Sequence, residues 1–262
     1  MTTRRAFLLS FSALACRTAM TPRERVDRAL AGRDVDRTPF TVWYHFGLEK
    51  EPGERHAEAT LQFHRKFSTD LVKVMSDYPY PRPAGAWYEL REESNPFPEQ
   101  IRALERIREG LAGKAHFIET IFNPWNVAEK LSSKEAVQQL KQDRPQALID
   151  ALEAIARSEA NHARRALEAG ASGIFLAIAN AEAGVLTREE YRKFSEPFDR
   201  MVLEAARQAP LNTLHLHGTQ VHLDLFYTGW PATVLHYDAH GTGVAIRDVR
   251  KQFGGTILGG LD

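Results

Sequence analysis

Two histidines near the end of an apolar segment are the first residues whose spacing suggests chemistry. His215 and His217 stand two apart in LNTLHLH, residues 211–217, and Gly218 follows them. Residues two apart in an extended strand point to the same side, and neutral imidazole is a common zinc ligand. The pair is therefore a candidate metal site. Hydrogen bonds to neighbouring carbonyl groups are the structural alternative.

Asp77 is the candidate catalytic carboxylate. It follows the short apolar segment 71–75 and precedes a proline-rich stretch, 78–83. A carboxylate in a closed site can stabilise positive charge that develops in a substrate. Capping of the following turn is the alternative role, but a position after a predicted strand favours the catalytic one.

Other polar and aromatic side chains that follow predicted strands are candidate substrate contacts. They are Tyr44, His45, Asn123, Trp125, Asn180, Glu182, Asp238 and His240. Packing is an equal alternative for the Asn-Pro-Trp stretch 123–125, and a solvated polar loop is the favoured alternative for 236–240. Glu182 or Asp238 could also supply a carboxylate ligand to a metal.

Strands and helices that alternate along the chain must position these residues. The predicted strands span 38–44, 71–75, 115–122, 173–179, 211–217, 233–237 and 256–260. Helices are predicted between them, for example over 98–111 and 187–206, with Ser132/Glu135 and Thr187/Glu190 as capping pairs. Such alternation indicates α/β architecture with a parallel sheet. A doubly wound open sheet is the alternative, but no glycine-rich phosphate loop follows the first predicted strand.

The position of the polar residues favours a (β/α)8 TIM-type barrel, because such barrels build their active sites at the carboxyl ends of the strands. Seven predicted strands are one short of closure, and the sequence stops at Asp262 directly after the last of them. We therefore expect a barrel that is truncated after the seventh strand.

Composition excludes several classes of protein. The 262 residues carry no net charge. We therefore do not expect nucleic-acid binding, which usually needs an excess of basic residues. Cys16 is the only cysteine, which rules out an intrachain disulfide and cysteine-rich zinc modules. No apolar run reaches the roughly 20 residues of a membrane span. The expected partner is a small-molecule substrate, and a homodimer is compatible with this composition.

The first residues resemble an export signal. Arg4 and Arg5 precede a short apolar run that ends at Ala15, which is typical of a twin-arginine signal over residues 1–19. The barrel domain would then span residues 20–262. The alternative is a translation start at Met20 and a cytoplasmic protein.

Three groups of segments resemble the uroporphyrinogen decarboxylase superfamily. They are residues 21–26 with 36–39, residues 170–175 with 186–191 and 194–197, and residues 214–218 with 259–262. The resemblance implies a (β/α)8 barrel. The superfamily contains decarboxylases of uroporphyrinogen and zinc-dependent methyltransferases that work with corrinoid proteins.

The decarboxylase branch implies carboxy-lyase chemistry without a metal. Its catalytic aspartate matches Asp77. Its substrate-binding Met-Arg-Gln-Ala-Gly-Arg stretch corresponds to residues 43–48, where both arginines are absent and Gly47 is kept. The position of its tyrosine falls near Lys130 and that of its serine near Ala181, so neither residue type is matched in this sequence. Loss of the bidentate guanidinium donors argues against uroporphyrinogen itself, so the expected substrate is a tetrapyrrole or another small carboxylate.

The methyltransferase branch implies zinc held by a His-x-Cys pair and a later Cys. Here the pair reads His215-Leu216-His217, so the alternative function is a zinc-dependent methyltransferase-like enzyme with His215 and His217 as ligands and a corrinoid protein as partner. A third alternative is a ligand-binding barrel without catalytic activity.

Overall fold

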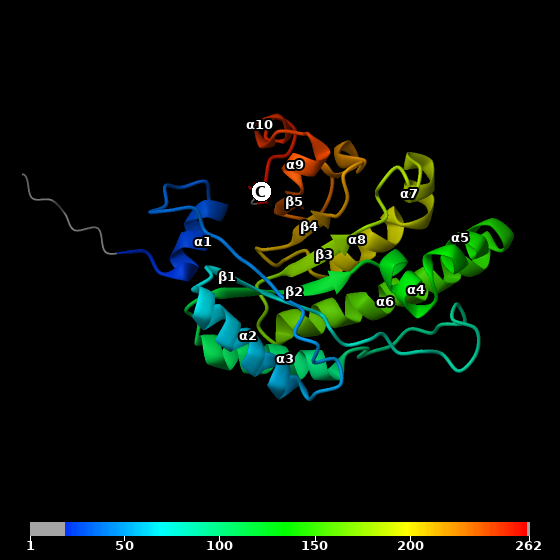
Figure 1. Cartoon of the computed structure of the whole chain (residues 1–262), viewed down its shortest axis with the longest axis horizontal. Helices are drawn as coiled ribbons and strands as arrows, with labels where there is room; N and C mark the ends of the chain where they lie inside the picture. The colour runs from blue at the N-terminus through cyan, green and yellow to red at the C-terminus, as the bar shows by residue number, and fades with distance from the viewer. Residues whose placement is uncertain (1–18, 261–262) are drawn as a thin grey trace, which may run out of the picture.

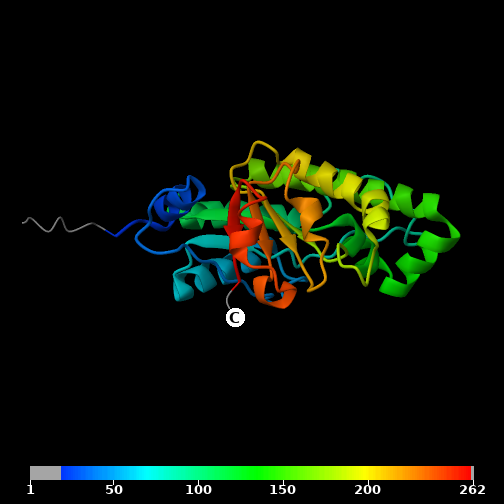
Figure 2. The same ribbon diagram turned by 90° about the horizontal axis from the view of Figure 1, so that it is seen from above.

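The protein is built around a parallel sheet whose strands are ordered as they occur in the chain. A computed structural model describes residues 19–260. The strands are β1 (Leu71–Val74), β2 (His116–Phe122), β3 (Ile174–Ile178), β4 (Thr213–Leu216), β5 (Val234–Tyr237) and β6 (Thr256–Leu258). Each pairs in parallel only with its neighbours in the chain, and Figure 2 shows β6 at one edge of the sheet. The result is a curled, incomplete (β/α) barrel, as the sequence predicted.

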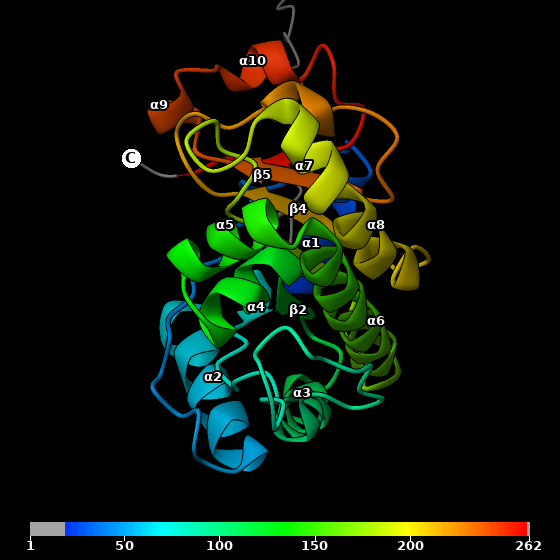
Figure 3. The ribbon, with the colours of Figure 1, turned by 90° about the vertical axis from the view of Figure 1, so that its right-hand side faces the viewer.

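Helices cover the outer face of the sheet (Figures 1 and 3). The long ones are α2 (Gly53–Phe67), α3 (Pro98–Leu111), α6 (Pro145–Glu168) and α8 (Glu196–Ala205). The shorter ones are α1 (Pro22–Leu30), α4 (Pro124–Leu131), α5 (Lys134–Asp143), α7 (Arg188–Phe194), η1 (Leu223–Phe226), α9 (Ala239–Thr242) and α10 (Ile246–Val249). Helix α2 packs on α3, α3 on α6 and α6 on α8. This order follows the strands that the helices connect, as right-handed β–α–β winding requires.

Six of the predicted strands are confirmed, and the first, over residues 38–44, is wrong. That segment is extended but forms no ladder: the Phe40 carbonyl accepts one backbone bond, from Asp70 N at 2.9 Å, and the Asp70 side chain accepts from Phe40 N at 3.0 Å. The aromatic residues that suggested a strand serve another purpose. Trp43 packs across the sheet, with its ring 5.7 Å from that of Phe175 and 6.0 Å from that of His236.

Local signals set several helix ends. The predicted capping box of Thr187 and Glu190 is confirmed at the start of α7. The capping box predicted for Ser132 and Glu135 is wrong: Ser133 caps α5 by accepting from Ala136 N at 3.1 Å, and Ala136 has no side chain that could complete the box. The single helix predicted over 187–206 is two helices that meet at Ser195. Pro197 at the start of α8 lacks an N–H and cannot continue α7.

Apolar clusters fill the fold on both faces of the sheet. Large apolar clusters lie between the sheet and its helices, with Leu148, Leu152 and Ile155 of α6 among their fully buried members. A smaller cluster, which includes Val26, Ile118 and Val234, fills the amino-terminal end of the barrel interior. The carboxyl end is therefore left to polar side chains.

A buried ion-pair network closes the amino end. Arg25 of α1 contacts Asp36 at 2.6 Å and Asp70 at 2.5 Å, and Arg37 also binds Asp70. The first family-like segments, 21–26 and 36–39, supply three of these four residues. They are therefore structural, because they fix α1 and the following loop to the base of β1.

None of the helices within residues 19–260 combines the length and apolarity that a membrane span needs. Residues 1–18 of the predicted twin-arginine signal, with Cys16, lie outside the described part, as do residues 261 and 262.

Candidate active site

Two adjoining cavities open at the carboxyl ends of β1 to β4. We call the first, of about 510 Å³, the Asp77 cavity, because Asp77 lines it together with residues of α4 and α6. We call the second, of about 550 Å³, the mouth cavity, and Lys73, His215 and His217 line it. His45, Thr120 and Phe122 line both. Parallel winding thus gathers Asp77 and the two predicted histidines at one end of the barrel.

Asp77 is held between two histidines. Its side chain is almost buried, His45 Nδ1 lies 2.5 Å from Oδ1, and His56 Nε2 lies 3.6 Å from Oδ2. Burial raises the pKa of Asp77, but His56 and His45 lower it by more, so the net pKa is below the usual range. Asp77 is therefore a carboxylate at neutral pH, and exposed His45, its partner, lines both cavities.

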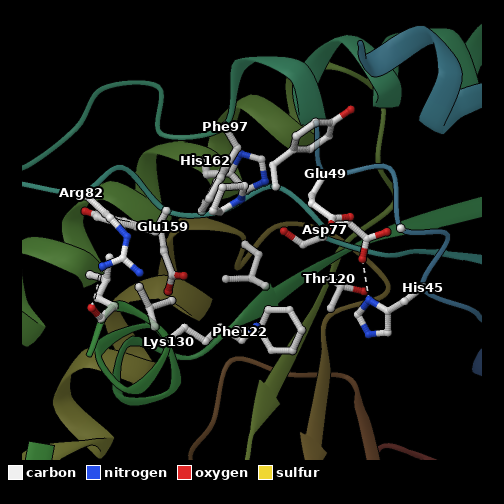
Figure 4. Close-up of a pocket in the computed structure, with 18 residues that line it drawn as sticks. His45, Glu49, Asp77, Arg82, Phe97, Thr120, Phe122, Lys130, Glu159 and His162 are labelled. Atoms are coloured by element: carbon white, nitrogen blue, oxygen red, sulfur yellow. Dashed lines mark hydrogen bonds and ion pairs between the residues drawn. The ribbon is translucent and has the colours of Figure 1, made fainter. Parts of the chain in front are cut away.

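The opposite end of the Asp77 cavity is cationic. Figure 4 shows Arg82, Lys130 and Glu159 on one side of the cavity, and His45 and Asp77 on the other. Arg82 donates to the Leu131 carbonyl at 3.0 Å, while burial lowers the pKa of Lys130 to about 8. The cavity can therefore bind an anionic group of a ligand beside Arg82 and Lys130, and a positively charged group beside Asp77.

Three fully buried polar atoms in this cavity have no hydrogen-bond partner within the described residues. They are Glu159 Oε2, His162 Nδ1 and Thr120 Oγ1. Burial also raises the pKa of Glu159 well above its usual value, and the nearby carboxyl of Asp199 adds to this. Buried polar groups without partners cost stability, so the chain keeps hydrogen-bonding capacity there that a ligand can use.

A histidine cluster lies beside the mouth cavity, which His215 lines. The strand register sets His215 beside His236, their Nδ1 atoms lie 2.5 Å apart, and His215 stacks on Phe175 at 4.9 Å. Burial lowers the pKa of His215 to about 2 and that of His236 to about 4. Both rings are therefore neutral imidazoles at physiological pH.

This cluster does not complete a zinc shell by itself. The ring centroids of His215 and His217 lie 6.1 Å apart, and the Nδ1 of His215 is engaged by His236. Over residues 19–260, no group of three or more His, Cys, Asp or Glu side chains is arranged to hold a metal ion. Glu182 lines the same cavity, but its Oε1 accepts from Thr219 N at 3.0 Å.

Gly218, directly after the histidine pair, makes the Glu182 contact possible. Its φ of +116° favours glycine, and a Cβ at this position would lie 2.7 Å from the Glu182 carboxyl carbon. Gly218 therefore lets the Glu182 carboxylate lie against the backbone after β4, where Thr219 N and Gln220 N donate to it.

Asn123, Asn180 and Trp125 do not line either cavity. Asn123 Nδ2 donates to Asn180 Oδ1 at 2.8 Å and to Asp199 Oδ1 at 3.0 Å. Asn180 also donates to Ser195 Oγ at 2.8 Å. Trp125 is 1% exposed and packs in the core. These three side chains form part of the packing beneath the cavities, which fully accounts for their burial.

Tyr44, Asp238 and His240 also stay outside the two cavities. The Tyr44 ring is 63% exposed and packs edge-on against Phe46. Asp238 caps α9 by accepting from Gly241 N at 2.8 Å, and exposed His240 is part of that short helix. The chain turns into α9 directly after β5, which directs both residues away from the mouth.

Several lining residues escaped the sequence analysis. Lys73 stands within the apolar segment LVKVM, and Glu159 and His162 interrupt the apolar stripe of α6. In each case the sequence did contain a signal for a functional residue: an ionisable side chain at a position where the apolar pattern predicts burial. Arg82, in the proline-rich loop, offered no such signal.

Comparison with known proteins agrees with this fold. The family model described as "Uroporphyrinogen decarboxylase (URO-D)" matches residues 79–262, so Asp77 lies just before the matched part. No curated protein gives a significant match. Among solved structures, a methyltransferase from Methanosarcina mazei is similar with a TM-score of 0.71 and 15% identity, over 91% of this chain and 82% of its own. By fold and by sequence, the chain belongs to the uroporphyrinogen decarboxylase family.

Proposed function

We propose that this chain is a carboxy-lyase that acts on a small carboxylate in the Asp77 cavity. The observation that carries the proposal is the polarity of that cavity, with Arg82 and Lys130 at one end and ionised Asp77 at the other. Few cations line it, which suits a substrate with few carboxylates better than uroporphyrinogen.

In the proposed reaction, Lys130 and Arg82 hold a carboxylate that does not react. The reacting carbon lies beside Asp77. Protonation of this carbon places positive charge on the substrate, and Asp77 stabilises that charge. The bond between carbon and the leaving carboxylate then breaks, its electron pair neutralises the charge, and CO2 departs. His45 is positioned to deliver this proton, because it binds Asp77 through Nδ1 and its ring faces the cavity.

The test is CO2 release from a panel of small mono-, di- and tricarboxylates, in buffer that contains a metal chelator. Asp77→Asn should lower kcat by about 10²-fold or more, since it removes one preorganised electrostatic contact. Asp238→Asn is the matched control: it follows another strand but only caps α9, so it should retain activity. Equal activity of Asp77→Asn and wild type would refute the proposal.

A second candidate is a zinc-dependent methyltransferase-like enzyme, with His215 and His217 as ligands and a corrinoid protein as partner. The observation that favours it is the convergence of these histidines and Glu182 on the mouth cavity. Since the described side chains do not complete a zinc shell, we derive no step through the metal. Stoichiometric zinc in the purified protein, lost in His215→Ala, would support this candidate over the first.

A further inference from the structure

Lys73 is a buried basic residue that has no acidic partner in the described part of the chain. It lies on β1 with only 6% of its surface exposed, and it lines the mouth cavity. Its Nζ lies 2.8 Å from the Met75 sulfur, 4.6 Å from the centre of the Trp43 ring and 4.4 Å from that of Phe175. Among residues 19–260, no carboxylate lies within ion-pair distance of this amine. Lysine is seldom buried in this way unless it has a partner or a function.

The surroundings of Lys73 favour a neutral amine. Burial lowers its pKa to about 7, although Glu119 and Asp77 raise it in part. Glu119 is committed elsewhere, since it accepts from Gln100 and His162. The neutral imidazoles of His215 and His236 complete the environment and offer no counter-charge. A neutral amine is a nucleophile, whereas an ammonium ion is not.

We propose that Lys73 is a nucleophilic amine that forms an imine with the carbonyl group of a small ligand in the mouth cavity. The Nζ lone pair adds to the carbonyl carbon, a proton moves from nitrogen to oxygen, and loss of water leaves a C=N bond. Hydrolysis reverses the step, so no oxidant or reductant is needed. Buried lysines serve this chemistry where desolvation keeps them neutral.

The cavity suits this chemistry in size and lining. Its volume of about 550 Å³ holds a small ligand, and the Trp43 and Phe175 rings restrict the approach to Nζ. His45 and His217 also line the cavity and can exchange protons with the intermediate and with solvent. Imine capture needs no loss of CO2, so this inference does not depend on the proposed carboxy-lyase activity.

The experiment traps the imine in the full-length native protein. Acetoacetate is added at pH 7.5, sodium borohydride reduces any imine, and peptide mass spectrometry locates the adducts. Lys66 is the internal control: its Nζ also lies over an aromatic ring, that of Phe67, but it is exposed. We expect at least about tenfold more adduct on Lys73 than on Lys66, because each unit of lower pKa raises the neutral fraction about tenfold.

Lys73→Met removes the amine and keeps most of the bulk of the side chain, so it should lose this adduct while exposed lysines react as before. An adduct on Lys73 no greater than that on Lys66 would overturn the inference. The two proposals are tested separately. An adduct on Lys73 supports imine formation whether or not it keeps the carboxyl group, whereas CO2 release that persists in Lys73→Met and is lost in Asp77→Asn supports the carboxy-lyase activity.

Discussion

The two ends of the barrel differ in how their buried ionisable side chains are paired. At the amino end, Arg25 and Asp70 are buried and fully paired with each other, with Asp36 and with Arg37. At the carboxyl end, Lys73 has no carboxylate partner among residues 19–260, and Glu159 has an oxygen without a hydrogen bond to any of them. Unpaired buried charge is costly and paired charge is less so. The paired side chains at the amino end therefore stabilise the fold, whereas the carboxyl end retains polar atoms that a ligand can bind.

The largest effect should come from breaking the paired end. Arg25→Met keeps the bulk of the side chain but leaves Asp70, which is fully buried, with Arg37 as its remaining cation. We expect a loss of about 3–5 kcal/mol in the free energy of unfolding, as for removal of one partner from a buried pair.

Urea titration of both proteins measures this loss. Arg102→Ala breaks an exposed pair with Glu99 and should leave the unfolding midpoint unchanged within error. If both variants were equally stable, the amino-terminal network would not have the structural role described here.

A smaller effect of opposite sign is expected at the carboxyl end. The pKa of Lys73 is about 7 in the fold and 10.5 in an unfolded chain. Between pH 7 and pH 10.5 the unfolded state binds more protons than the folded state, so the free energy of unfolding rises with pH. The destabilisation that Lys73 causes is therefore greatest below pH 7. Lys73→Met should therefore be more stable than wild type near neutral pH, less the lost contacts with Trp43 and Phe175.

The measurement is urea unfolding of wild type and Lys73→Met from pH 6 to pH 10. The advantage of the variant should shrink as the pH rises. An advantage that is constant with pH, or a less stable variant at every pH, would contradict the assignment of an unpaired amine.

The smallest effect is expected for Glu159→Gln, because the wild-type carboxyl is raised in pKa and the amide resembles its protonated form. A carboxyl with a raised folded pKa stabilises the fold fully below its unfolded pKa of 4.5, and this stability is lost as the pH rises. The two proteins should be nearly equal in stability near pH 4. The variant should then gain relative to wild type toward pH 8, as thermal unfolding at several pH values would show.

The sequence predicted those parts of the fold that depend on local pattern. Period-two spacing was enough to set His215 and His217 on one side of a strand, and Thr187 with Glu190 was enough to place a helix start. The segment 38–44 misled because Trp43 packs over the mouth cavity and the segment joins no ladder. Its surroundings depend on strands more than a hundred residues away.

The candidate site was predicted less completely than the fold. Asp77 follows β1, so its position could be inferred, whereas His45 was predicted from a strand over residues 38–44 that does not form. Asn123 lies after a strand as well, but its partner Asp199 comes from α8, and sequence spacing gives no sign of that contact. Lys73 and Glu159 became candidates only when their burial and missing partners were known.

A crystal structure of the full-length protein soaked with succinate would show whether the Asp77 cavity binds carboxylates. We expect a carboxylate bound between Arg82 and Lys130, with the rest of the molecule directed toward Asp77. Succinate bound instead among the arginines of the amino end, or an Asp77 cavity that stays empty at saturating ligand, would contradict this expectation.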